Sequence, residues 1–212
     1  MIERKTVRHL AATAALLLLV VHNPAQAAGS AFFGGQQTES DDLSAFTKWT
    51  AILPRYEEQK ASVDEECTDE SCTNVKWEKL ISDLDGKPVD EQMKAVNAFF
   101  NAVPYITDEA NWGIVDFWQT PYETMARGGD CEDYAIAKYL TLQRLGVSAD
   151  DMRIMIVRDM NRGGEMHAVL ELTNDDTRYL LDNQTQKIVA ENHTTRYRPI
   201  YAINESNWWA YQ

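Results

Sequence analysis

Apolar residues recur at two different spacings along the chain, and these spacings divide it into a helical part and an extended part. Spacings of three and four residues, typical of amphipathic helices, predict helices over residues 43–53, 76–84, 89–102 and 131–145. Pro54 follows the first of these helices, and because proline lacks a backbone N–H we expect it to end or kink that helix. Gly146 is expected to stop the last one.

After Gly146 the spacing of apolar residues shortens to about two, as in β-strands. This spacing predicts strands over residues 153–157, 166–172, 178–182 and 196–203. Turn-forming residues at 161–164 and 174–176 predict hairpins that join the first three strands. Pro199 is expected to confine the fourth strand to a sheet edge or a strand start. Helices followed by an antiparallel sheet predict an α+β fold.

The first 27 residues have the pattern of a secretory signal peptide. Three basic residues precede an apolar run over residues 10–21, and Ala25-Gln26-Ala27 then offers a cleavage site between small residues. The run is shorter than the roughly 20 apolar residues that a permanent membrane helix needs, so we do not expect an integral membrane protein. An uncleaved anchor is the alternative to a cleaved signal peptide. We predict a signal peptide over residues 1–27, a flexible lead-in over 28–41 and one domain over 42–212.

The remaining chain is strongly acidic. The first 27 residues carry three Lys or Arg and one Glu, so the net charge changes from −13 for the whole chain to −15 for the rest. Nucleic-acid binding proteins draw much of their affinity from Lys and Arg, so this charge argues against a nucleic-acid partner. It is compatible with divalent cations or a basic partner, although most of these charges are expected to serve solubility.

Three cysteines occur, and export would place them in an oxidising compartment. Cys67 and Cys72 lie five residues apart in a polar, turn-like stretch and can pair as a small-loop disulfide. A zinc site is the alternative, but structural zinc usually takes four protein ligands and the stretch offers no others nearby. Cys131 is left without a partner, which makes it a candidate reactive thiol.

Cys131 follows two glycines at the start of a predicted helix. The free backbone N–H groups and the positive end of the helix dipole at this position favour a thiolate. A small buried cysteine at a helix start would also fit the sequence.

His167 and Asp182 are polar residues in otherwise apolar predicted strands. Each needs a buried partner, and adjacent strands of a hairpin could place them side by side. We therefore predict a Cys131–His167–Asp182 relay, in which the imidazole takes the thiol proton and the carboxylate orients the imidazole. A core histidine with no catalytic role is the alternative for His167 alone, and His193 is expected to be exposed in a polar stretch.

Three acidic residues, Asp130, Glu132 and Asp133, surround Cys131. Negative charge next to a thiol raises its pKa and opposes thiolate formation, although acidic residues do suit a helix start. A bound hard cation would offset the excess charge, and calcium prefers carboxylate oxygens. The sequence therefore suggests a calcium site beside Cys131.

The motif Gly129-Asp130-Cys131-Glu132-Asp133-Tyr134-Ala135 resembles that of the bacterial transglutaminase-like cysteine proteinases. Three further segments share the resemblance, namely Trp118-x-Thr120-Pro121, His167-Ala168-Val169 and Leu181-Asp182-Asn183-Gln184. The resemblance extends from about Asp42 to the C-terminus and is greatest to the LapG type, periplasmic proteases that release biofilm adhesins.

The resemblance implies a papain-like fold in which the nucleophile helix packs on an antiparallel sheet. It implies that Cys131, His167 and Asp182 form the catalytic triad and that Asp130, Glu132 and Asp133 bind Ca²⁺. It also implies a periplasmic enzyme that cuts the N-terminal region of a large surface adhesin at a paired-alanine site. An inner-membrane receptor for cyclic di-GMP, of the LapD type, would restrain its activity.

Two other classes of function remain open at this point. The same triad could serve an acyl-transferring or amide-hydrolysing enzyme, such as a transglutaminase or a peptidoglycan amidase, because the residues do not decide whether water or an amine resolves the acyl-enzyme. A calcium-binding module with a structural cysteine would need no catalysis at all.

Overall fold

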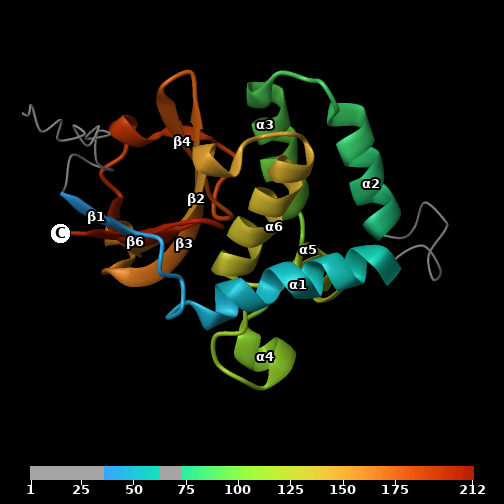
Figure 1. The fold of residues 1–212 in the computed structure, drawn as a ribbon, viewed down its shortest axis with the longest axis horizontal. Helices are drawn as coiled ribbons and strands as arrows, with labels where there is room; N and C mark the ends of the chain where they lie inside the picture. The colour runs from blue at the N-terminus through green and yellow to red at the C-terminus, as the bar shows by residue number, and fades with distance from the viewer. Residues whose placement is uncertain (1–35, 63–72) are drawn as a thin grey trace, which may run out of the picture.

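The structure, a computed structural model, describes residues 36–62 and 73–212. The predicted α+β fold is confirmed, with the helices before residue 145 and most strands after it (Figure 1). The helices are α1 (Thr47–Ser62), α2 (Thr73–Leu84), α3 (Val89–Asn101), α4 (Asp108–Trp112), α5 (Pro121–Arg127) and α6 (Cys131–Arg144). The strands are β1 (Gln37–Ser40), β2 (Met152–Asp159), β3 (Glu165–Asn174), β4 (Thr177–Leu181), β5 (Val189–Ala190), β6 (Tyr197–Ile203) and β7 (Trp208–Tyr211).

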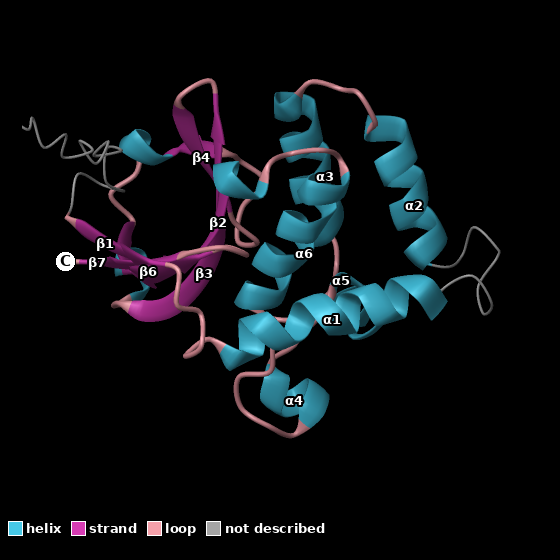
Figure 2. Ribbon diagram, viewed as in Figure 1, coloured by secondary structure: helices cyan, strands magenta, loops and turns pink. Residues whose placement is uncertain are grey.

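The strands form a single sheet in the order β1-β7-β6-β2-β3-β4-β5. Every pair of neighbouring strands is antiparallel. The helices gather on one side of the sheet, with α6 against the strands and α2 beyond α6 and α3 (Figure 2). Helix α6 packs on both β2 and β3, so the expected helix-on-sheet arrangement is present.

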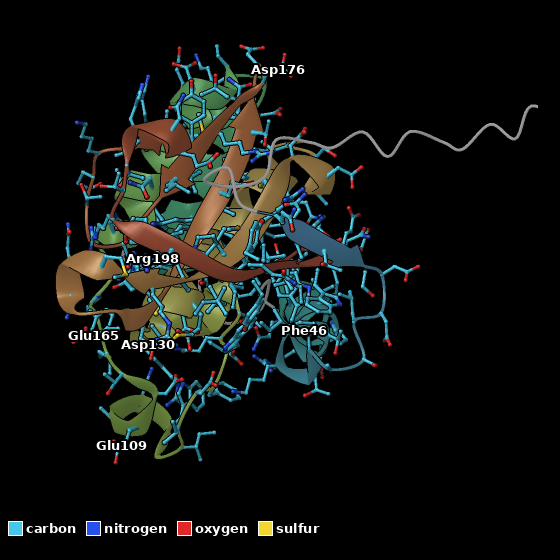
Figure 3. The ribbon with its side chains drawn as sticks, turned by 90° about the vertical axis from the view of Figure 1, so that its left-hand side faces the viewer. Phe46, Glu109, Asp130, Glu165, Asp176 and Arg198 are labelled. Atoms are coloured by element: carbon cyan, nitrogen blue, oxygen red, sulfur yellow. The ribbon has the colours of Figure 1, made fainter. Side chains whose placement is uncertain are left out.

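Alternate residues of the long strands enter two different cores. Ile154 and Ile156 of β2 face the helices and join the large core to which α1, α2, α3, α5 and α6 contribute. Met155 and Val157 point to the opposite face, where they pack in a smaller core with Trp209 of β7. Successive side chains of a strand point to opposite faces, so a strand that is buried on both faces has the nearly continuous apolar sequence seen in β2. In the view of Figure 3 the β3–β4 turn at Asp176 and helix α4 at Glu109 mark opposite ends of the molecule.

The first helix is longer than predicted, because α1 continues through Pro54. Of the two expectations for Pro54, that it ends the helix or that it kinks it, the first is therefore wrong. Ile52 and Tyr56, on either side of the proline, are both buried in the core, and Arg55 forms an ion pair with Glu123. Tertiary packing supplies most of the stability of a helix in a protein, and here it outweighs the loss of one backbone hydrogen bond.

The position of β6 also differs from the prediction. Strand β6 lies inside the sheet, between β7 and β2, although Pro199 was expected to confine it to an edge or a strand start. Strand β7 pairs only with residues 201–203, so Pro199 has no strand neighbour on that side. On the other side, the register with β2 shifts between Ile156 and Val157. Proline is tolerated at such locally unpaired positions and bulges, which explains its place in a central strand.

Residues 37–40 correct the prediction of a flexible lead-in over 28–41. They form β1, which pairs with β7 at the edge of the sheet. Its residues are polar and at most half-buried, so it lacks the apolar alternation that reveals a strand in the sequence. The predicted signal peptide and the Cys67–Cys72 pair lie outside the described residues. Among residues 36–62 and 73–212, no helix combines the length and apolar character needed to cross a bilayer.

Two short helices, α4 and α5, lie in a stretch that periodicity left without regular structure. The start of α5 does carry a local signal. Thr120 caps it in a reciprocal capping box with Glu123, and Pro121 occupies its first turn. This turn brings the chain back to the start of α6.

Replacement of a core isoleucine tests the packing of α1. Ile52 is fully buried, so Ile52→Ala is expected to lower the free energy of unfolding by about 2–5 kcal/mol through the cavity that it leaves. Ile114 is 52% exposed and serves as the matched control, with an expected change within about 0.5 kcal/mol for Ile114→Ala. Urea denaturation measures both values. Equal losses for the two variants would contradict the burial of α1.

Candidate active site

Cys131 is the first residue of α6, the helix that packs on the sheet, and its side chain is half-buried. The chain reaches it through Gly128 and Gly129. A Cβ at Gly129 would lie 2.5 Å from Oδ2 of Asp133, and Gly128 has φ +79°, with a Cβ position 2.6 Å from the carbonyl oxygen of Pro104. Only glycine suits both positions. The two glycines therefore let the loop pass close to the helix start and present Cys131.

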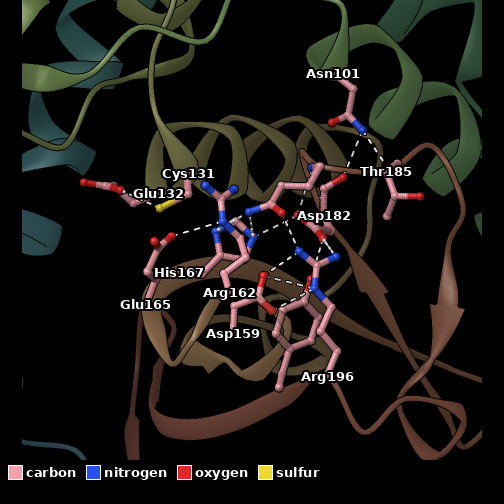
Figure 4. A network of polar contacts seen from close by, with 12 residues as sticks. Asn101, Cys131, Glu132, Asp159, Arg162, Glu165, His167, Asp182, Thr185 and Arg196 are labelled. Carbon is pink, nitrogen blue, oxygen red and sulfur yellow. Dashed lines mark hydrogen bonds and ion pairs between the residues drawn. The ribbon is translucent and has the colours of Figure 1, made fainter.

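His167 and Asp182 form a buried pair behind this cysteine. His167 Nε2 lies 2.9 Å from Asp182 Oδ1, and both side chains are almost fully buried. His167 belongs to β3, and Asp182 directly follows β4. Figure 4 shows Asp182 on the opposite side of the imidazole from Cys131. Because the carboxylate lies at Nε2, Nδ1 is the ring nitrogen available as a base, with the side-chain amide nitrogen of Gln184 3.4 Å from it.

Asp182 is held by donors from several parts of the chain. The backbone N–H of Gln184 and the hydroxyl of Tyr197 donate to its carboxylate, and Arg196 Nη1 lies 3.4 Å from Oδ2. Burial by itself would raise the pKa of Asp182, but the hydrogen bonds from His167, Gln184 and Tyr197 outweigh it and lower that pKa to about 2. The carboxylate is therefore charged at neutral pH and keeps the imidazole oriented.

Arg196 connects Asp182 to a second buried carboxylate. Its Nε donates to both oxygens of Asp159 at 3.0 Å, and its Nη2 donates to the side chain of Gln184. The guanidinium holds the pKa of Asp159 below its usual range, although burial opposes this. One arginine thus balances two buried carboxylates, which removes most of the cost of placing them in the protein interior.

Cys131 and His167 line one cavity of about 70 Å³, together with Tyr105, Met166 and Gln184. The thiol of Cys131 donates to Glu132 Oε2 at 3.2 Å. Burial raises the pKa of the Cys131 thiol well above its ordinary value, and the charges of Glu132 and Asp130 raise it further. In this state the thiol is protonated, so a base and additional positive charge are both needed to activate it.

Three carboxylates form a cluster beside the cavity. Oxygens of Asp108, Asp130 and Asp133 lie within 4.8 Å of one another. Asp108 is buried at the start of α4, and its Oδ2 accepts from the backbone N–H of Phe117. Gln119 holds Asp133, because its backbone N–H donates to Oδ1 at 2.8 Å. Oδ1 of Asp108 and Oδ1 of Asp130 have no hydrogen-bond partner among the described residues.

The electrostatics of this cluster fit a bound cation. Burial raises the pKa of Asp108, and it raises that of Asp133 to about 7 and that of Glu132 to about 9. The charge of Asp130 adds to each of these shifts. Converging carboxylates with unpaired oxygens are the donor set that calcium prefers. Asp108, Asp130 and Asp133 could therefore hold a calcium ion in a site whose oxygens are already close together.

The structure brings all six predicted site residues into one region, where they fall into three groups. Cys131, His167 and Asp182 lie in the expected order, and Asp130 and Asp133 share a cluster. Glu132 instead groups with Asp130 and Cys131. His193 lies exposed in a short turn, as predicted.

Sequence reasoning missed two residues of this region, Asp108 and Arg196. Asp108 reaches the cluster from a separate helix and carried no motif of its own. Arg196 was the first residue of the predicted strand 196–203 and lies just before the observed β6, and a single arginine at a strand start gave no sign of two buried carboxylate partners.

Comparison with known proteins identifies similar sequences and structures. The model of the bacterial transglutaminase-like cysteine proteinase family matches residues 61–211. The solved structure of calcium-bound LapG from Legionella pneumophila is 31% identical, with a TM-score of 0.62, and the match covers 75% of this chain and 87% of that one. EGTA-treated LapG from the same organism matches at 31% identity and TM-score 0.62, over 76% of this chain and 86% of that one. The comparison with curated protein sequences gives no match.

The charge state of Asp182 predicts a pH dependence of stability. Its pKa is about 2 in the folded protein, against about 3.9 for an unfolded chain, so its contribution is present above pH 4 and lost as the pH falls towards 2. Between pH 5 and pH 2 the free energy of unfolding of the wild type is expected to fall by about 2 kcal/mol more than that of Asp182→Asn. Chemical denaturation across this range measures the difference. Asp176→Asn, in an exposed turn, is the control and should follow the wild type.

Proposed function

We propose that this chain, which belongs to the family of bacterial transglutaminase-like cysteine proteinases, is a calcium-dependent periplasmic endopeptidase that cleaves a large surface adhesin. Cleavage in the N-terminal region of the adhesin would release it and promote biofilm dispersal. The observation that carries the proposal is one cavity lined by Cys131 and by His167, whose imidazole is bound to a charged Asp182. The carboxylate cluster beside this cavity supports the calcium dependence.

Each residue has a role in peptide hydrolysis. His167 Nδ1 takes the proton of the Cys131 thiol, and the thiolate attacks the carbonyl carbon of the scissile bond. The backbone N–H of Cys131, which has no acceptor inside α6, can donate to the oxyanion that forms. His167 then gives its proton to the leaving amine, and a water molecule, deprotonated by the same imidazole, hydrolyses the thioester. Asp182 holds the imidazole in one orientation and stabilises its charged form throughout.

The proposed calcium ligands are Asp108, Asp130 and Asp133. Asp130 also groups with Cys131 and Glu132. Because Asp130 belongs to both groups, Glu132 is a candidate further ligand. A calcium ion supplies positive charge when bound, which offsets the negative charge that raises the pKa of Cys131. The similarity to LapG, whose structure is known both calcium-bound and EGTA-treated, supports this proposal.

The proposed location is the periplasm, and the proposed restraint is a LapD-type inner-membrane receptor for cyclic di-GMP. The signal-peptide pattern of residues 1–27 supports export. The family and the similarity to LapG support the adhesin and the receptor as partners. The acidic charge of the chain is consistent with protein partners rather than nucleic acid.

The loss of the thiol tests the protease function. Wild-type protein is expected to cut the N-terminal region of a co-encoded adhesin in the presence of calcium, whereas Cys131→Ala, with no nucleophile, gives no product. Mass spectrometry of the products identifies the new termini, and a thermal melt checks that the variant is folded. Crosslinked or amine-transfer products without cleavage would instead establish a transferase. Cleavage by a folded Cys131→Ala would refute the assigned nucleophile.

Removal of one clustered carboxylate tests the calcium site. Asp108→Asn is expected to weaken calcium binding at least about 10-fold and to raise the calcium concentration needed for cleavage, because the site loses one of its charged ligands. Isothermal titration calorimetry of chelator-treated protein measures the affinity. Glu109→Gln, the exposed neighbour in the same helix, is the matched control with unchanged affinity. Full-rate cleavage in excess EGTA would contradict calcium dependence.

A further inference from the structure

A second, larger cavity lies beside the start of α1 and is not part of the site described above. Its volume is about 260 Å³, against about 70 Å³ for the cavity at Cys131. Aromatic side chains dominate its walls: Phe46 and Trp49 from the α1 end, Trp118 from the loop before α5, and Tyr201 from β6. This volume is below the roughly 300–1,000 Å³ of pockets for drug-sized ligands, so it suits a single large side chain.

The rim of the cavity is polar and held in place. Lys48 and Asp116 form an ion pair across it, and Asp116 also accepts from the indole N–H of Trp118 at 2.9 Å. Trp118 is 7% exposed, so its indole is a firm wall rather than a mobile flap. Aromatic walls combined with a few placed polar groups are the usual composition of a recognition pocket.

This aromatic cavity is close to the nucleophile through two separate connections. Trp118 directly precedes Gln119, which binds Asp133 in the first turn of α6. On the sheet side, His167 is paired with Val157 of β2, and the adjacent Ile156 is paired with Tyr201. Two strand spacings of about 4.8 Å therefore separate the backbone at His167 from the backbone at Tyr201.

Tyr201 and Cys131 both pack on the helix side of the sheet, whereas His167 is on the face of its partner Val157, which belongs to the smaller core. The charge of Glu132, which contacts the Cys131 thiol, adds to the raised pKa of the Tyr201 hydroxyl, although burial is its main cause. Figure 3 shows Asp130 between two labelled residues of the cavities. Glu165 lines the cavity at Cys131, and Phe46 lines the aromatic cavity.

We infer that the aromatic cavity is a substrate subsite, which takes an aromatic or branched aliphatic side chain within three residues of the scissile bond. An extended peptide advances about 3.3 Å per residue, so about three residues span the two strand spacings that separate the backbones at His167 and Tyr201. The inference rests on the proposed protease function and deepens it, because it assigns a side-chain preference to the substrate. The small polar cavity at Cys131 takes the residue next to the scissile bond, and the aromatic cavity supplies the selectivity.

A filled cavity tests the subsite. Ala45 lines the cavity from an exposed loop, so Ala45→Trp places an indole in the cavity without changing the core. The probe is a tryptic peptide library from a bacterial proteome, incubated with calcium, with cleavage sites identified by mass spectrometry. Ala51→Trp, at an exposed position of α1 outside the cavity, is the matched control. Ala45→Leu introduces a smaller side chain into the same cavity, and it keeps the test valid if the indole of Ala45→Trp disturbs folding.

The wild type is expected to select a large apolar residue at one position near the cut, with at least about 10-fold higher kcat/KM for Leu than for Ala in matched peptides. Ala45→Trp should abolish that preference through KM, Ala45→Leu should weaken it, and Ala51→Trp should keep it. Unchanged preference in folded Ala45→Trp overturns the subsite while the protease function stands. A wild type that cuts neither the library nor the adhesin fragment overturns both.

Discussion

The enclosure of α6 is the constraint on which the rest of the structure depends. Its residues from Asp133 to Leu142 are all buried, with the sheet on one side and α3 and α5 on the others. Because the helix is held along its length, its first residue is presented at a defined place between helices and sheet. Enclosure extends even to Lys138, where burial lowers the pKa to about 7, so the amine need not carry its charge in the core.

The same enclosure concentrates negative charge at the helix start. Asp130 and Asp133 cap α6 in a reciprocal box, which a helix N-terminus favours, but Asp108 and Glu132 add charge beyond what a cap requires. Burial raises the pKa values of Asp108, Glu132, Asp133 and Cys131, and the charge of Asp130 raises them further. A helix start built in this way is poor at activating a thiol by itself, and it is suited to a cation that restores the balance.

The sheet supplies the opposite arrangement, a carboxylate whose charge is stabilised. Asp182 follows β4, and its donors come from β3, from β6 and from the loop between β4 and β5. Its pKa therefore falls, whereas the pKa values beside Cys131 rise. Asn101 of α3 donates to the backbone oxygens of Asp182 and Thr185 at 2.9 Å. Through this contact the helical half positions the loop after β4, so both halves of the molecule determine the geometry of the His167–Asp182 pair.

The sequence by itself determined the α+β order, the long helices and strands, and the residues Cys131, His167 and Asp182. These could be found because periodicity persists in long elements and because the chain has only three cysteines and four histidines. Asp108 could not be singled out among 33 acidic residues, and only folding brings it to Asp130. The paths of the chain at β1, Pro54 and Pro199 were likewise decided by tertiary structure, since pairing and packing with distant residues outweighed local preference there.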